Sequence, residues 1–313
     1  MAPASPEEDL RPSKPKVIYV MGAGRSGSTI LGVALGNCDG IFFAGELDKW
    51  LPRAGEPTRK DAARVAFWER VRARMGDPEI LVGARPRRYL ERSSALFRVD
   101  CLRARSRLRA TYREATSELF AAIAAAAAAD YVVDSSHYPL RAHELQSLAE
   151  IELYLVLLVR APQSVVASFA RDDVAERRFG PVTTRAYLLL TYLLSARVFR
   201  AQPAERRLVL FYEDLLEDPV GVLGELLERV GSPAQVPDLS ALATGVPLHG
   251  NRLLGVEVVA LGGSAQRGGA SAGGFGARLF ARLLLGGLSR LKPRVGGHPP
   301  TARPAQDAAT LAR

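Results

Sequence analysis

The sequence predicts an α/β protein with a central parallel sheet flanked by helices. Three observations predict this fold class. Short apolar runs alternate with helical segments, a glycine-rich loop follows the first apolar run, and one later run is apolar throughout. Strands that alternate with helices form parallel sheets with right-handed crossovers. A strand that is apolar throughout is typical of the buried centre of such a sheet.

Five segments have the apolar, β-branched pattern of strands. They are VIYVM at 17–21, IFFAGEL at 41–47, YVVD at 131–134, IELYLVLLV at 151–159 and RLVLFY at 207–212. The residues after YVVD are expected to form a loop that leads into a helix. The helices expected between the strands include ILGVAL, an alanine-rich segment TSELFAAIAAAAAAD, QSVVASFAR behind Pro162, RAYLLLTYLLSARVFR, and DPVGVLGELLERVG behind Asp218.

The chain divides by composition into three parts. We expect residues 1–15 to be a disordered lead-in, residues 16–260 to form the functional domain, and residues 261–313 to be a basic, Gly/Ala/Arg-rich segment that is partly disordered. Within the domain, the arginine-rich residues 51–113 are predicted to be a helical insertion on the acceptor side. In the last part, FGARLFARLLLGGLSRLKPR has the pattern of a basic amphipathic helix, which either packs on the core or contacts a membrane surface.

The bulk composition is that of a globular protein, with 313 residues, 48% hydrophobic and 24% charged. The formal net charge of +9 favours anionic partners such as nucleotides, and general solubility explains it equally well. The two cysteines, Cys38 and Cys101, form no zinc pattern and no disulfide framework. Together with a polar N-terminus that lacks a secretory signal pattern, this predicts a cytoplasmic protein.

The loop GAGRSGST follows a strand and starts a helix, so its free backbone N–H groups and the helix dipole predict an anion site. Its glycines match GxGxxG, and Glu46 lies about 20 residues further on, as the ribose-binding acid of a dinucleotide site does. The loop also nearly matches the phosphate loop of NTPases, but Ser28 replaces the lysine. A third interpretation places a 5′-phosphosulfate there. Arg25 would then stabilise the charge that develops on the leaving phosphate, and the hydroxyls of Ser28 and Thr29 would hold that phosphate.

A second segment, VLLVRAPQSVVASFARD, places Arg160 at the end of a strand and Ser168 on the helix that follows. A guanidinium fork and a hydroxyl at this separation can converge on one phosphate. The segment resembles the 3′-phosphate motif of bacterial sulfotransferases that use 3′-phosphoadenosine 5′-phosphosulfate (PAPS). GAGRSGSTIL resembles their 5′-phosphosulfate loop with Arg in place of Lys, YVVDSSHYPLRAHEL their DSSK-x-P-x-R-A segment, and FYEDLLEDPVGVLGELLERVG the segment after the late core strand.

This resemblance spans roughly residues 16–232, with all four segments in the same order. It implies a P-loop nucleotide-kinase-like domain, with a sheet of about five strands and no metal requirement. The implied reaction is sulfuryl transfer from PAPS, the co-substrate, to a hydroxyl or amine of a carbohydrate, lipid, peptide or natural product. Nucleic acid is not an expected partner. The donor-binding residues implied are Gly24, Arg25, Ser26, Gly27, Ser28, Thr29, Arg160 and Ser168, with Asn251 and Arg252 from HGNRLLG.

Three residues are candidates for catalysis: Arg25, Glu46 and His137. In sulfotransferases with this type of loop, a Glu of a Gly-Glu pair at the position of Glu46 can deprotonate the acceptor. A solvated or ion-paired glutamate is the alternative interpretation. His137 replaces the family lysine of DSSK, and it can support the sulfuryl group if protonated or as a neutral N–H donor. Otherwise it is a polar loop residue.

Other interpretations stay open at this point. They are an NAD(P)-dependent Rossmann enzyme that uses the GxGxxG loop, a P-loop NTPase or kinase, and a non-catalytic module that binds anionic glycans. Asp134 is expected to cap a helix or pair with an arginine rather than to bind a metal. His249 is interpreted as a loop residue.

Overall fold

The five predicted strands form one parallel sheet in the computed structural model, which describes residues 14–76, 83, 85–97, 101–169, 181–262 and 279. The strands are β1 (Lys16–Gly22), β2 (Ile41–Gly45), β3 (Tyr131–His137), β4 (Glu152–Val159) and β5 (Arg207–Phe211). Their order is β2-β3-β1-β4-β5, and every neighbouring pair is parallel. The predicted α/β fold with a central parallel sheet is therefore confirmed.

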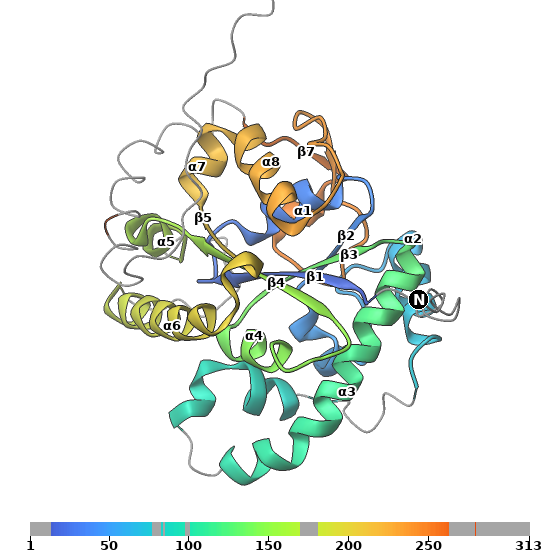
Figure 1. The fold of residues 1–313 in the computed structure, drawn as a ribbon, viewed down its shortest axis with the longest axis vertical. Coiled ribbons are helices and arrows are strands. Elements are labelled where there is room, and N and C mark those ends of the chain that lie inside the picture. The colour runs from blue at the N-terminus through green and yellow to red at the C-terminus, as the bar shows by residue number, and fades with distance from the viewer. Residues whose placement is uncertain are drawn as a thin grey trace, which may run out of the picture.

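Helices cover both faces of this sheet and produce three layers (Figure 1). One face carries α1 (Ser28–Gly36), α7 (Tyr212–Glu217) and α8 (Pro219–Val230). The other face carries α2 (Ala62–Arg72), α3 (Cys101–Ala127), α4 (Pro139–Leu145), α5 (Pro162–Phe169) and α6 (Pro181–Ala201). Short helical turns lie at Leu47–Lys49, Leu51–Arg53, Arg87–Glu91, Ser93–Phe97, Ala204–Arg206 and Arg252–Gly255.

The central strand β1 shows why the sheet needs helices on both sides. Val17, Tyr19 and Met21 pack into one hydrophobic core with α3, α4 and α6, whereas Ile18 and Val20 pack into a second core with α1 and α8. All five side chains are at most 1% exposed. Because successive residues of a strand point to opposite faces, an unbroken apolar run is what a strand covered on both faces requires.

The strand order bears on the dinucleotide interpretation of the glycine loop. In the Rossmann order, the second strand lies beside the first, so the acid after it reaches the ligand bound at the loop. Here β3 lies between β1 and β2. The end of β2 is therefore two strand spacings, roughly 10 Å, from the end of β1. The topology differs from the Rossmann order and matches the P-loop-like fold that the resemblance implied.

Strand β3 is longer than the sequence indicated. The expected strand ended at residue 134 and a loop was expected to follow it, but β3 continues to His137. Ser135 and Ser136 are completely buried. The backbone N–H and the hydroxyl of Ser136 both donate to Oδ1 of Asp134. The expectation of a loop directly after residue 134 was therefore wrong, because these hydrogen bonds to Asp134 let Ser136 occupy a buried strand.

Between β2 and β3, the described residues form helices joined by turns and irregular segments, with no strand among them. The boundary expected at residue 113 falls inside α3, so the alanine-rich segment and the arginine-rich segment before it share one helix. After α8, β6 (Leu242–Ala243) and β7 (Val258–Val259) form a small antiparallel pair. The amide of Asn37 at the end of α1 exchanges two hydrogen bonds with the backbone of Ala243, which anchors this returning segment beside α1.

The predicted lead-in, 1–15, and the predicted C-terminal segment, 261–313, with its amphipathic helix, lie outside the described residues, apart from residues 14, 15, 261, 262 and 279. Within the described part of the chain, no helix combines the length and apolar character needed to cross a membrane.

Candidate active site

The glycine loop adopts a conformation that exposes backbone N–H groups at the start of α1. Arg25 and Gly27 both have left-handed backbone angles, with φ of 68° and 98°. A Cβ at Gly27 would overlap the ring of Tyr212, so this position needs glycine for both its φ angle and its space. A helix N-terminus that follows such a loop directs unpaired N–H groups and a positive dipole end toward an anion.

Two predicted donor-binding arginines meet at this loop. Nε of Arg25 donates to Oγ of Ser168 at 3.2 Å, and Nη1 of Arg160 donates to the carbonyl of Arg25 at 2.9 Å. The guanidinium of Arg160 also lies 4.4 Å above the ring centroid of Tyr212. The structure thus brings together Arg25 from the glycine loop with Arg160 and Ser168 from the segment that follows β4. Tyr212, which the sequence analysis missed, supports both Arg160 and Gly27.

His137 lies on the other side of the glycine loop. It ends β3 with a left-handed φ of 58°, and its ring centroid is 4.3 Å from that of Tyr138. A Cβ built on Gly24 would be 4.0 Å from Nε2 of His137 and 3.5 Å from the phenol oxygen of Tyr187. That phenol accepts a hydrogen bond of 3.1 Å from the backbone N–H of Gly24. His137 therefore lies beside the glycine loop, at the end of β3 rather than in a loop.

The hydroxyl residues of the loop differ in exposure. Ser26 is 1% exposed and lies beside the phenol of Tyr192, and Thr29 is 3% exposed. Ser28 is half-buried and begins α1. Because the side chain of Ser26 is buried beside Tyr192, we expect Ser26 to contribute its backbone N–H group rather than its hydroxyl.

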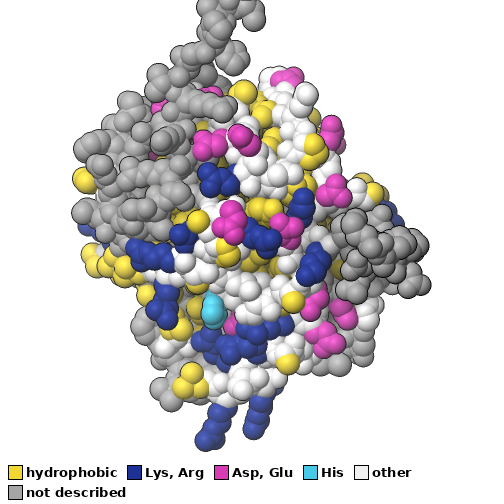
Figure 2. Space-filling model, viewed as in Figure 1, with side chains coloured by type: hydrophobic (Ala, Val, Ile, Leu, Met, Phe, Trp, Pro, Cys, Tyr) yellow, Lys and Arg dark blue, Asp and Glu magenta, His cyan; other side chains and the backbone are white. Residues whose placement is uncertain are grey.

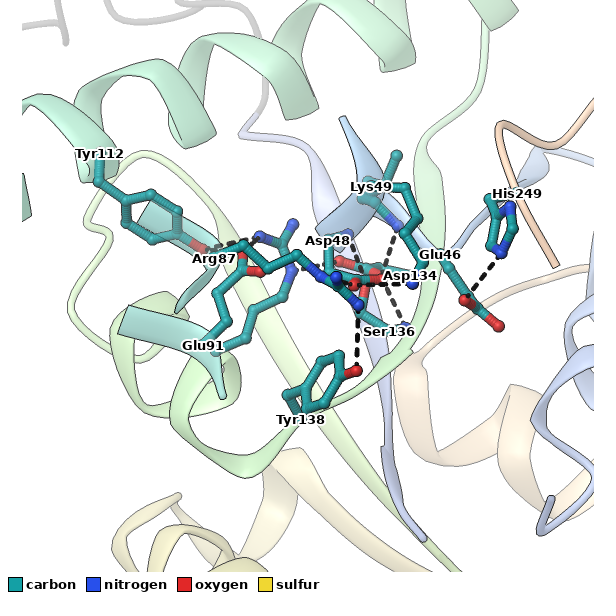
Figure 3. Close-up of polar contacts among 12 residues, drawn as sticks. Glu46, Asp48, Lys49, Arg87, Glu91, Tyr112, Asp134, Ser136, Tyr138 and His249 are labelled. Atoms are coloured by element: carbon teal, nitrogen blue, oxygen red, sulfur yellow. Dashed lines mark hydrogen bonds and ion pairs between the residues drawn. The ribbon is translucent and has the colours of Figure 1, made fainter. Parts of the chain in front are cut away.

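The turn that carries Glu46 is held from two sides. Its own backbone N–H donates to the carbonyl of His249 at 2.9 Å. The next two residues are held by β3: the N–H of Leu47 donates to Oδ1 of Asp134 at 3.4 Å, and the N–H of Asp48 donates to Oγ of Ser136 at 2.9 Å. The carboxylate of Glu46 points toward His249 and lies apart from the buried carboxylates (Figure 3).

A buried ionic network extends from this turn into the helical insertion (Figure 3). Oδ2 of Asp134 accepts from Nε of Arg141 at 3.0 Å, which confirms the expected pairing of Asp134 with an arginine. Nη1 of Arg141 donates to Glu91 at 2.6 Å and to the phenol of Tyr112 at 2.7 Å. Burial raises the pKa of Glu91 above its ordinary value, although Arg141 opposes that shift. The network ties the insertion to the end of β3.

Several arginines of the insertion have carboxylate partners within the protein. Lys and Arg side chains gather on the face over α3 and α4 (Figure 2). Arg109 and Arg113 from α3 both donate to Glu144, whose carboxylate is completely buried. Nε of Arg87 donates to Oδ2 of Asp48 at 2.6 Å. The positive charges of these three arginines are therefore balanced by carboxylates within the protein, and they need no acidic acceptor to explain them.

Asn251 and Arg252 lie in the segment that returns after β6. Oδ1 of Asn251 accepts a hydrogen bond of 2.8 Å from the N–H of Leu253, so this oxygen caps its own helical turn. With Thr58 and Arg59, both residues line a cavity of about 140 Å³. Their predicted contact with the 3′-phosphate stays a prediction.

The candidate residues follow the carboxyl-terminal edge of the sheet in the order of its strands. Glu46 follows β2, His137 ends β3, the glycine loop follows β1, and Arg160 follows β4. Such an edge is where open α/β sheets bind ligands. A carboxylate at one end and two arginines at the other suit transfer of an anionic group to a proton-bearing acceptor. The described residues contain no group of three or more His, Cys, Asp or Glu side chains suited to a metal ion.

Comparison with known proteins adds a family assignment to this geometry. A model described as "Sulfotransferase family" matches residues 15–236, which include every candidate residue except Asn251 and Arg252. No curated protein matches the chain.

Solved structures with a similar fold include three sulfotransferases. The sulfotransferase domain from the curacin biosynthetic pathway is 20% identical, with a TM-score of 0.47, and the match covers 79% of this chain and 84% of that one. The domain from the Synechococcus PCC 7002 olefin synthase is also 20% identical, with a TM-score of 0.43 and coverage of 79% and 82%. A sulfotransferase from Mycobacterium avium is 14% identical, with a TM-score of 0.44 and coverage of 71% and 65%.

Proposed function

Since the chain belongs to the sulfotransferase family, we propose that it transfers a sulfuryl group from PAPS to a hydroxyl or amine of an acceptor. The observation that carries the proposal is the contact of the glycine loop with Arg160 and Ser168, which follow β4. Arg25 reaches Ser168, and Arg160 reaches the carbonyl of Arg25. Two guanidinium groups beside a row of backbone N–H donors suit a nucleotide with anionic groups at both its 5′ and 3′ positions.

On the donor side, the backbone N–H groups from Arg25 to Thr29 hold the 5′-phosphosulfate, with the dipole of α1 behind them. Arg160 and Ser168 bind the 3′-phosphate, the guanidinium as a fork and the hydroxyl as one further donor. Arg25 lies between these two regions, because its side chain contacts Ser168 while its backbone belongs to the loop. It stabilises the charge that collects on the leaving phosphate as the sulfur–oxygen bond breaks.

On the acceptor side, Glu46 removes the proton of the attacking hydroxyl or amine, and His137 supports the sulfuryl group or the acceptor atom. PAPS supplies the activated sulfuryl group. The acceptor atom forms a bond to sulfur, the bridging sulfur–oxygen bond breaks, and 3′-phosphoadenosine 5′-phosphate (PAP) leaves with the electron pair. The acceptor approaches from the side where β2 ends, because Glu46 lies there. It is a small molecule, glycan or lipid rather than a nucleic acid.

A binding experiment tests the donor class without knowledge of the acceptor. Melting of the purified protein is followed with PAP, AMP, ATP and NAD in separate titrations. Selective binding stabilises the folded state by about 2.7 kcal/mol at 100 times the dissociation constant. We expect PAP to raise the melting temperature and AMP to raise it much less. Stabilisation by NAD alone would indicate a Rossmann enzyme, ATP hydrolysis an NTPase, and glycan binding without nucleotide preference a binding module.

A further inference from the structure

The segment that carries His249 is joined by its backbone to two other parts of the chain. The N–H of Leu248 donates to the carbonyl of Ala44 at 2.9 Å, and the N–H of Glu46 donates to the carbonyl of His249 at 2.9 Å. The N–H of Thr58 donates to the carbonyl of Leu248 at 3.0 Å. His249 is therefore fixed between the end of β2 and the start of the helical insertion, although it lies far from both along the sequence.

Both ring nitrogens of His249 face defined side chains. Nε2 lies 3.5 Å from Oε2 of Glu46, and Nδ1 is hydrogen-bonded to the hydroxyl of Thr58. The side chains of His249 and Glu46 are 26% and 18% exposed. The separation of 3.5 Å is long for a hydrogen bond, but catalytic hydrogen bonds often shorten only when substrate binds. In Figure 3 the imidazole and the carboxylate point toward each other.

The charge state of His249 determines what it can do for Glu46. Burial lowers the pKa of His249 to about 4, and the positive charge of Lys49 acts in the same direction. The imidazole is therefore neutral at pH 7 and carries one N–H group. If the hydroxyl of Thr58 donates to Nδ1, the proton lies on Nε2 and faces the carboxylate of Glu46. A neutral imidazole in this arrangement orients the carboxylate without forming an ion pair that would make it a weaker base.

This pair also adjoins the glycine loop. A Cβ built on Gly250, the residue after His249, would be 3.7 Å from the methyl group of Thr29 in the first turn of α1. The same segment lines the cavity of about 140 Å³ with Thr58. His249 thus lies where the end of β2, the start of α1 and this cavity meet.

We propose that His249, held by Thr58, is a positioning residue that orients the carboxylate of Glu46 for removal of the acceptor proton. This inference rests on the proposed function. It assigns a role to a histidine that the sequence alone indicated to be a loop residue. His249 acts through Glu46 and does not itself take the proton, because a neutral imidazole that resists protonation is a weak base.

The kinetic test compares His249→Ala with His249→Gln, because the glutamine amide can place an N–H group near the position of Nε2. We expect His249→Ala to lower kcat roughly 10- to 100-fold, within the range of effects on general-base catalysis, with PAP affinity unchanged. His249→Gln should recover most of this loss. In a Glu46→Gln background, His249→Ala should cause little further loss, since residues that act as a unit are not additive. Equal losses in both His249 variants, or additive losses with Glu46→Gln, would overturn the proposal.

A second measurement needs no activity. Imidazole nitrogen NMR of the whole protein, with the signal of His249 identified by its loss in His249→Gln, reports the tautomer and the protonation midpoint. We expect the proton on Nε2 and no titration above about pH 5, and we expect Thr58→Val to mix the two tautomers while Thr58→Ser does not. An ordinary titration with mixed tautomers in the wild type would overturn the positioning role. Failure of the wild type to bind PAP or transfer sulfuryl groups would instead overturn the proposed function.

Discussion

Nη1 of Arg160 donates to the backbone carbonyl of Arg25 at 2.9 Å, so the arginine that follows β4 holds the loop that follows β1. These two strands are neighbours in the sheet. The contact makes the proposed 3′-phosphate residue a support for the proposed 5′-phosphosulfate loop. In the proposed function, Arg160 anchors the donor, whereas Arg25 stabilises the charge that develops on the leaving phosphate. Substitution of Arg160 should therefore change mainly donor affinity, and substitution of Arg25 mainly kcat.

Arg160→Ala should weaken donor binding more than it slows the chemical step. Its guanidinium anchors the 3′-phosphate in the ground state, and loss of one partner of a buried charged contact costs about 2–5 kcal/mol. The measurement compares the affinity of the wild type and the variant for PAP and for AMP, which lacks the 3′-phosphate. Arg103→Ala is the matched control, because Arg103 is exposed on α3 and its loss removes the same charge. If Arg160→Ala still prefers PAP as strongly as the wild type does, Arg160 does not bind the 3′-phosphate.

Arg25→Ala should lower turnover strongly while PAP still binds. The interaction of Arg25 grows as charge moves to the leaving phosphate, so it belongs mainly to the transition state. We expect a loss in kcat of about 10²–10³, similar to removal of one oxyanion donor in other enzymes. Ser168→Ala removes the partner of Nε and should have a smaller effect on kcat. Equal losses in PAP affinity and in kcat would make Arg25 an anchor instead.

Gly27→Ala should abolish PAP binding and destabilise the fold. The left-handed backbone alone costs an alanine about 1–2 kcal/mol, and the new methyl group would overlap the ring of Tyr212. Because Tyr212 also lies under Arg160, its displacement disturbs both halves of the proposed donor site. Gly224→Ala is the control, since a Cβ there meets nothing within 4 Å and the residue lies inside α8. Thermal melting and PAP titration check this prediction, and wild-type PAP affinity in Gly27→Ala would contradict it.

The sequence predicted the central parts of the fold because those parts follow local rules. Each strand is an apolar run, and the loop after β1 carries the glycines that a strand-to-helix anion site needs. The end of β3 could not be predicted in this way. Ser135 and Ser136 look like loop residues, and only the position of the carboxylate of Asp134 shows why Ser136 can be buried.

The candidate site was predictable for residues that stand at strand ends, such as Glu46, His137 and Arg160. The residues that support them come from distant segments and carry no local pattern. Tyr212 contacts Gly27 and Arg160 only because β5 lies beside β4. His249 reaches Glu46 only because the chain returns from β6 past Ala44. Such contacts depend on the tertiary arrangement, which neither hydrophobic period nor motif spacing encodes.

The lowered pKa of His249 predicts a pH-dependent stability. The folded protein binds this proton only near pH 4, whereas an unfolded chain binds it near pH 6.5. Between these values the unfolded state holds more protons, so stability falls as the pH falls from about 6.5 to 4. The contribution of His249 is on the order of 3 kcal/mol, at about 1.36 kcal/mol for each pH unit.

Urea unfolding at pH 7 and pH 4.5 measures this effect. His249→Gln should lose less stability on acidification than the wild type, because it removes the group that must charge on unfolding. His143→Gln is the matched control, since His143 is exposed on α4. If the wild type and His249→Gln lose the same stability between the two pH values, His249 is not buried in its neutral form.

Glu46→Gln should keep the fold and PAP binding but lose most transfer to an alcohol, whose hydroxyl is a very weak acid. The amide keeps the size of the carboxylate but cannot accept the acceptor proton. Loss of a general base lowers rates by about 10²–10⁴-fold. A phenol with an electron-withdrawing substituent needs less help from a base, so its transfer should suffer less. The measurement is the rate of PAP release from PAPS with each acceptor, and Glu56→Gln, which alters an exposed carboxylate paired with Lys60, is the control. Full activity of Glu46→Gln on the alcohol would place the base elsewhere, and His137, beside Gly24 at the end of β3, would be the next residue to substitute.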